Sequence, residues 1–208
     1  MADLTLVEKQ LKKRIARGET GAIVELYDRY GESLLRYLTG RVGATDARDV
    51  LQNVFTRLFR YHKKLAKAEN LAAYIFLTAR NESIRFQKSL ARQNAKTQPL
   101  DQAQTVVDPA SSASSLEDKE TVAILLAQLD ETSREVVQLK IFSGLTFKEV
   151  AKIIGMPEQT AASKYRRAIE KLRQSQNEKV KAPDNLNGHV SDQSGIGTGN
   201  KSAINHGN

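Results

Sequence analysis

The sequence contains no cysteine, and this absence excludes two kinds of stabilising chemistry. Without thiols the chain forms no disulfide and holds no zinc ion through thiolates. The composition fits a reducing compartment, where disulfides are rare. The three histidines, His62, His189 and His206, lie far apart in the chain, so they predict neither a metal site nor an acid–base pair.

Long apolar runs are also missing from the sequence. No stretch approaches the roughly 20 consecutive apolar residues that a membrane-spanning helix needs. Residues 1–19 carry charges throughout and lack the apolar centre of a secretory signal. We therefore expect a cytoplasmic protein that does not insert into a membrane.

Recognisable catalytic motifs are absent as well. The segment 195–202 (GIGTGNKS) comes within one residue of the phosphate-binding loop pattern, with Asn200 where the second glycine belongs. Such a loop follows a strand, whereas polar residues precede this segment. With no cysteine nucleophile and no recognisable pair of catalytic carboxylates, we expect no enzyme, catalytic residue, metal, cofactor or small-molecule substrate.

What the sequence has in excess is positive charge. Lysine and arginine number 32 against 24 aspartate and glutamate residues, which gives a formal net charge of +8. An excess of cations favours an anionic partner such as nucleic acid, although basic surfaces also serve solubility alone. The positions of the cations have to decide between these two explanations.

Apolar residues recur at three- and four-residue steps over residues 4–88, which predicts several helices separated by short turns. The clearest helix begins near Thr45 and Asp46, which are good capping residues. A basic loop over residues 61–69 follows it, and a second long helix then runs from Leu71 past Lys88. The apolar face of the first of these helices carries Val50, Leu51, Val54, Phe55, Leu58 and Phe59.

A change of composition divides the chain. Residues 89–115 replace the periodic pattern with Gln, Ser, Ala, Asp and proline, which is typical of a flexible linker. Periodicity returns at Leu116 and continues to Arg173, with breaks at 129–130, 143–144 and 155–157. The predicted fold class is all-α, with a helical bundle over 1–88, the linker 89–115, a four-helix domain over 116–174 and a disordered tail over 175–208.

The second of these domains contains a helix-turn-helix pattern. A short helix bearing Phe147, Val150, Ala151 and Ile154 meets a tight turn at 155–157, after which a longer helix starts. The second helix of such a motif enters the major groove of DNA and reads bases with its N-terminal residues. An ordinary helical hairpin with a solvated basic face is the alternative. The candidate DNA-binding residues are Gln159, Thr160, Ser163, Lys164, Arg166 and Arg167.

Three segments in a fixed order resemble the extracytoplasmic-function (ECF) sigma factors of bacterial RNA polymerase. They are residues 46–60 (DARDVLQNVFTRLFR), residues 70–89 (NLAAYIFLTARNESIRFQKS) and residues 128–173, which contain the helix-turn-helix. One such segment could be a coincidence of helical composition, but three in order are hard to obtain by chance. The resemblance implies a sigma factor whose partners are core RNA polymerase, promoter DNA and an anti-sigma factor.

The resemblance also implies roles for individual residues. Asp49, Gln52 and Asn53 correspond to the family's polymerase contact, and they lie opposite the apolar stripe of their helix. The helix from Leu71 and the loop before it correspond to the part that binds the promoter element that melts. The candidate residues there are Lys63, Lys64, Asn81, Arg85, Lys88 and Arg92, of which the last four are spaced to form one stripe.

Four positions depart from the residues that are usual in this family. Arg48 stands where an acidic residue is usual, Tyr74 replaces a tryptophan, Arg85 stands where an aspartate is common, and Lys88 replaces an arginine. Base preference at the melting element is therefore expected to differ. Two other functions stay open, namely a helix-turn-helix regulator that needs no polymerase, and a sigma-like decoy that binds proteins but not DNA.

Overall fold

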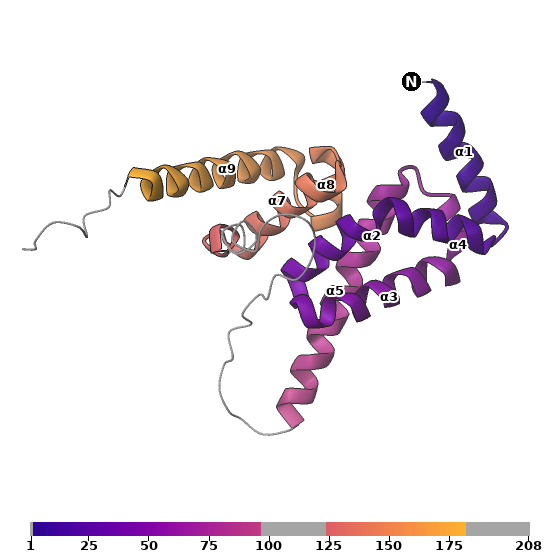
Figure 1. Cartoon of the computed structure of the whole chain (residues 1–208), viewed down its shortest axis with the longest axis horizontal. Coiled ribbons are helices and arrows are strands. Elements are labelled where there is room, and N and C mark those ends of the chain that lie inside the picture. Colours follow the sequence, from indigo (N-terminus) through magenta and orange to yellow (C-terminus); the bar gives the residue numbers. More distant parts are fainter. Residues whose placement is uncertain (1, 97–123, 182–208) are drawn as a thin grey trace, which may run out of the picture.

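The computed structural model describes residues 2–96 and 124–181, with side chains over 6–95 and 124–175. Within these ranges every regular element is a helix, which confirms the all-α class (Figure 1). None of the described helices is long and apolar enough to cross a membrane.

The N-terminal bundle consists of five helices. They are α1 (Ala2–Ala16), α2 (Thr20–Val42), α3 (Ala44–Arg60), α4 (His62–Ala66) and α5 (Leu71–Lys96). The helix predicted to begin near Thr45 is α3, and its N-cap is Gly43 without any side-chain capping bond. Gly43 has φ of 87°, so this single residue ends α2 and starts α3 at a sharp angle.

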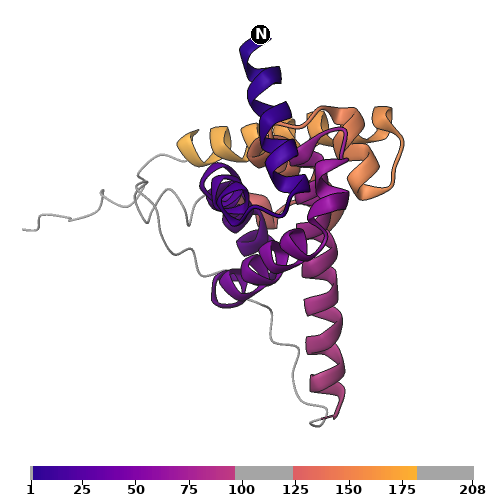
Figure 2. The same cartoon turned by 90° about the vertical axis from the view of Figure 1, so that its right-hand side faces the viewer.

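Two features of the bundle differ from the sequence-based expectation. The basic loop over 61–69 contains the short helix α4, whose Leu65 is fully buried. Helix α5 continues through the start of the expected linker to Lys96. Its C-terminal part extends away from the rest of the bundle (Figure 2).

The C-terminal domain begins with helical residues 124–127 and continues with α7 (Glu131–Ser143), α8 (Phe147–Ile154) and α9 (Glu158–Lys181). The three predicted breaks all fall between these helices. Residues 175–181, which the composition assigns to the disordered tail, are helical, so that prediction is wrong for them. Ser175 Oγ donates to Gln128 Oε1 at 2.7 Å and ties this part of α9 to the rest of the domain. Residues 97–123 and 182–208, with most of the predicted linker and tail, lie outside the described residues.

The helices of this domain are capped by the residues that the sequence places at their ends. Asp130 caps α7 by accepting from the backbone N–H of Ser133 at 3.0 Å. Thr146 and Glu149 form a reciprocal capping box at the start of α8. Gly155 ends α8 in the left-handed conformation, with φ of 85°, as the helix-turn-helix pattern requires.

We expect Asp130→Ala to lower the free energy of unfolding by about 1 kcal/mol, because it leaves an N-terminal amide of α7 without a partner. The side chain and backbone amide of Ser133 lower the pKa of Asp130 below 3.8. A carboxylate with a lowered pKa stabilises the fold above its unfolded pKa and loses this effect as the pH falls through the folded value. Urea unfolding at pH 7 and pH 3 should therefore show a smaller difference between wild type and variant at the lower pH.

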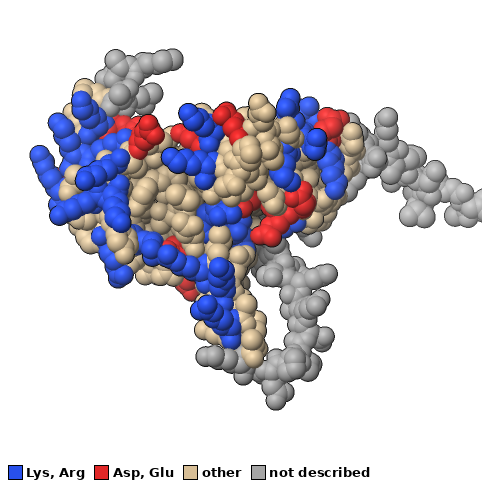
Figure 3. Space-filling model, turned by 180° about the vertical axis from the view of Figure 1, so that it is seen from behind, with Lys and Arg blue, Asp and Glu red and all other residues tan. Residues whose placement is uncertain are grey.

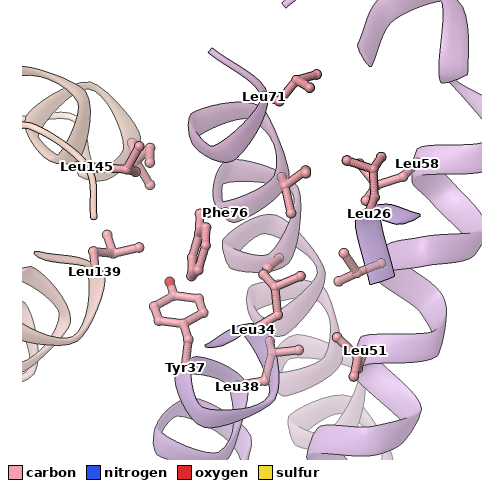
Figure 4. Close-up of a cluster of buried hydrophobic side chains, with 14 of the residues drawn as sticks. Leu26, Leu34, Tyr37, Leu38, Leu51, Leu58, Leu71, Phe76, Leu139 and Leu145 are labelled. Atoms are coloured by element: carbon pink, nitrogen blue, oxygen red, sulfur yellow. The ribbon is translucent and has the colours of Figure 1, made fainter. Parts of the chain in front are cut away.

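One hydrophobic core runs through both domains. Leu139 and Leu145 of the C-terminal domain belong to the same cluster of buried side chains as Tyr37 and Phe76 of the bundle (Figure 4). A small separate cluster formed by Leu129, Val137 and Ala168 lies within the C-terminal domain alone. The sequence pattern gives each half a core of its own and does not predict that the two domains pack together.

Candidate polymerase and nucleic-acid interfaces

The surface of α3 separates into an apolar and a polar face. Asp49, Gln52 and Asn53 are all exposed, as the periodicity predicts. The buried residues of the helix, which anchor it to the bundle, are Ala47, Val50, Leu51, Val54 and Leu58. The structure therefore holds one carboxylate and two amides on a rigid helix with their side chains in solvent.

Exposed aromatic rings lie beside this polar face. Tyr27 of α2 is 52% exposed, and its ring centroid lies 5.0 Å from that of Phe55, one turn along α3 from Gln52. Phe59, which the sequence places on the apolar face, is 45% exposed and lies beside the ring of His62. The apolar face of α3 is therefore not fully covered near its C-terminal end, where Leu58 is buried and Phe59 is not. Nothing in the sequence pattern distinguishes the exposed Tyr27 from a buried core residue.

A cluster of cations surrounds the turn between α3 and α4. Lys63 and Lys64 are exposed, as expected. The Tyr61 ring is 38% exposed and has Arg57 at 5.3 Å and Lys64 at 5.6 Å from its centroid. This arrangement combines a partly exposed aromatic ring with two cations over it, which suits contacts with an unstacked base and its phosphate.

The predicted stripe on α5 is present at the surface. Asn81, Arg85, Lys88 and Arg92 are all exposed. Figure 3 shows lysine and arginine gathered at the end of the molecule formed by α1 and α4, down α5 and along α9. Arg85 Nη1 lies 2.7 Å from Glu82 Oε1, and Arg57 Nε lies 3.3 Å from the same oxygen. Part of the charge of Arg85 is thus compensated within the protein.

Two other side chains of α5 pack into the core. Ile75 is fully buried and Tyr74 is half-buried against the core. His62 places Nδ1 2.9 Å from the carbonyl oxygen of Ile15 and so joins α4 to α1. Among the described residues, no group of three or more potential ligands could hold a metal ion.

The recognition helix is the N-terminal part of α9. Gln159, Thr160, Arg166 and Arg167 are exposed, while Ser163 and Lys164 are half-buried. Ala161 and Ala168 are buried and form the side that packs on the domain. The open groove of about 550 Å³ on its outer surface is lined by Ser163, Arg166, Arg167, Glu170, Lys171 and Gln174.

Lys164 has a partner that the sequence does not reveal. Its Nζ lies 3.6 Å from Asp130 Oδ1, the carboxylate that caps α7. The pair is partly exposed, so it costs little to separate. Lys164 is less exposed than Arg166 and Arg167, and part of its charge is compensated within the protein.

The fold and these surfaces define a class of protein: a two-domain helical DNA-binding protein with one helix-turn-helix domain and one basic helical bundle. Comparisons with known proteins agree with this class. Residues 26–93 match the protein family Sigma-70 region 2, and residues 125–174 match the family Sigma-70, region 4.

Individual relatives narrow the assignment. The chain is 29% identical over 169 residues to the ECF RNA polymerase sigma factor BldN of Streptomyces coelicolor, a match that covers 78% of this chain and 63% of BldN. It is 28% identical to the ECF RNA polymerase sigma factor SigL of Mycobacterium tuberculosis, over 76% of this chain and 90% of SigL.

A solved structure shows the same fold. The sigma factor RpoE of Bartonella quintana, crystallised in complex with the anti-sigma factor NepR, superposes with a TM-score of 0.57 at 21% identity and covers 74% of this chain and 97% of that chain. The protein belongs to the ECF RNA polymerase sigma factors, with region 2 in the N-terminal bundle and region 4 in the C-terminal domain. This family acts in transcription initiation and is not enzymatic.

Proposed function

We propose that this chain binds core RNA polymerase through Asp49, Gln52 and Asn53 of α3 and brings it to promoters through α5 and α9. The observation that supports this division is the exposure of all three polar α3 side chains on the face opposite the buried stripe. Such a rigid, solvated face fits a protein partner better than a nucleic acid, because it carries a carboxylate.

The C-terminal domain reads the upstream promoter element in this proposal. Gln159, Thr160 and Ser163 present hydrogen-bonding groups at the N-terminal end of α9, where a recognition helix meets base edges. Arg166 and Arg167, together with Lys164, supply the phosphate contacts that fix its position on the duplex. Gly155 sets the angle at which α9 enters the groove.

The N-terminal bundle binds the element that melts. Removing a base from the stack costs a few kcal/mol, so stacking and phosphate contacts have to offset this cost. The exposed Tyr61 ring and the exposed Lys63 and Lys64, of which Lys64 lies over the ring, supply both kinds of contact. Asn81, Arg85, Lys88 and Arg92 continue this surface along α5 and guide the single strand.

An anti-sigma factor is the regulatory partner that fits this proposal. The RpoE structure from Bartonella quintana contains such a factor, and the present chain has the same fold. We place the protein in the bacterial cytoplasm, where core RNA polymerase and DNA are found.

Promoter binding with and without polymerase tests the proposal. A promoter fragment is selected from a randomised pool by the complex of core enzyme and this chain, and mobility shifts are then measured at 50 and 200 mM salt. We expect specific binding that requires core enzyme and weakens steeply with salt, since phosphate contacts release counterions. Equal binding without core enzyme would instead identify an ordinary helix-turn-helix regulator, and failure to select any fragment would identify a decoy.

A further inference from the structure

A buried carboxylate joins region 4 to region 2. Glu135 of α7 is 5% exposed, and its Oε1 lies 2.9 Å from the hydroxyl of Tyr37, from Arg41 Nη1 and from Arg80 Nε. These three groups belong to α2 and α5 of region 2. Burial and, to a smaller extent, the charge of Glu135 hold the pKa of Tyr37 well above 10.0. The phenol therefore keeps its proton and donates a hydrogen bond to the carboxylate.

The cations around Glu135 are themselves held in place. The Arg41 side chain is 6% exposed, and its Nε donates to Ser83 Oγ at 2.9 Å. Removing one partner of a buried ion pair is strongly destabilising, because it leaves an uncompensated buried charge. Removing the carboxylate leaves two cations facing each other at the interface.

The helices also approach closely beside this cluster. A Cβ added to Gly40 of α2 would lie 2.0 Å from Nε2 and 3.0 Å from Cδ of Gln138 on α7. Gln138 is 3% exposed, and its buried amide would have to shift for this Cβ to fit. The absence of a side chain at Gly40 therefore permits the two domains to pack at this distance.

The packing brings the two promoter-binding surfaces together. A cleft of about 620 Å³ between the domains is lined by Lys88 of the α5 stripe on one side and by Ile154 and Met156, just before the recognition helix, on the other. At the other end of α5, Asn70 Nδ2 donates to Glu149 Oε1 of α8 at 2.6 Å. Hence α5 lies beside the turn that leads into α9.

This placement limits what both surfaces can bind at once. The N-terminal end of a recognition helix enters a groove about 12 Å wide, and the phosphate backbones that border this groove pass beside the preceding turn. With α5 beside that turn, a duplex on α9 and a single strand on α5 compete for the same space.

We propose that the packed arrangement is a self-inhibited state of the chain, closed by Glu135 and by the close contact at Gly40, which has to open before both promoter elements are bound. The inference rests on the proposed promoter-binding roles of α5 and α9. A promoter duplex that contacts both surfaces binds only the open state, so its affinity is reduced by the open fraction. If about one molecule in ten is open, a fully open variant binds the duplex about tenfold more tightly.

The test compares Glu135→Arg with Glu32→Arg in the full chain. Glu32 lies on α2 with its side chain 67% exposed, and it pairs with Arg36 of the same helix, so the same charge change there leaves the interface intact. Because the chain has no cysteine, Arg29→Cys on α2 and Lys152→Cys on α8 accept two spin labels and no others. The distance between the labels is measured without DNA. The Kd of each unlabelled variant is then measured for one promoter duplex, which is the duplex that core enzyme and the wild-type chain select.

We expect Glu135→Arg to lengthen the distance between the labels and to bind the duplex about tenfold more tightly, while Glu32→Arg resembles wild type in both. A Glu135→Arg variant with the wild-type distance between the labels would overturn the proposal. A longer distance with an unchanged Kd for the duplex would overturn it as well. Whether core enzyme and the wild-type chain select a duplex at all tests the proposed function separately.

A second pair of variants introduces no charge and guards against misfolding of Glu135→Arg. Gly40→Ala adds the Cβ that meets Gln138, whereas Gly31→Ala on the same helix adds one at an ordinary 3.5 Å from Tyr27. Both alanines favour the helix. Only Gly40→Ala should open the chain and tighten duplex binding. Identical behaviour of the two alanine variants would contradict the inference.

Discussion

Replacing Asp49 and Gln52 together with alanine is expected to weaken binding to core RNA polymerase by roughly 100-fold. Truncating one partner of a hydrogen-bonded charge pair that becomes buried in a complex costs about 2–5 kcal/mol. The fold should be unaffected, because both side chains are exposed and the buried stripe of α3 is on the opposite face. Fluorescence anisotropy of the labelled chain titrated with core enzyme measures the change.

Glu32→Ala is the control for this double variant. It removes another exposed carboxylate, on α2, whose ion pair with Arg36 contributes little to stability. We expect it to bind core enzyme as the wild type does. If the double variant kept wild-type affinity, α3 would not be the polymerase-binding surface.

The second large effect is expected in the recognition helix. The triple variant Ser163→Ala, Lys164→Ala, Arg167→Ala should weaken promoter binding by the holoenzyme by about 100-fold or more, since each base or phosphate contact contributes about 1–3 kcal/mol. Arg167 should account for more of the loss than Lys164, which shares its charge with Asp130. Affinity for core enzyme should be retained.

Salt dependence identifies the kind of contact that is lost. Loss of two phosphate contacts lowers the slope of log K against log salt by about 2. Lys9→Ala on α1 removes an exposed cation from region 2 and serves as the control, with an unchanged slope. A triple variant that lost binding to core enzyme and to promoter together would contradict the division of roles between α3 and α9.

Local features of the fold were predictable because they depend on residues close together in the sequence. The turn at Gly155, the break at Asp130 and the apolar stripe of α3 follow from capping and periodicity. The exposure of the α5 stripe follows from helical spacing in the same way. The family resemblance added the candidate roles of these surfaces, which helical spacing alone does not supply.

Features that depend on distant residues were not predictable. Glu135 lies in a helix whose local sequence gives no reason to bury a carboxylate, and its partners Arg41 and Arg80 are 94 and 55 positions away. Helices α7 and α8 lie between Asp130 and Lys164 in the sequence. Helical periodicity assigns each of these residues to a solvated face, because it contains no information on what that face meets.

Run-off transcription is the most direct test of the central claim that this chain is a promoter-specificity subunit. Core enzyme, the full chain and a linear template with the selected promoter are combined with nucleotides. We expect a transcript of defined length that appears only when the chain is present, is lost with the Asp49 and Gln52 double variant, and is retained with Glu32→Ala. No transcript from the wild-type chain, or an equal amount from core enzyme alone, would contradict the claim.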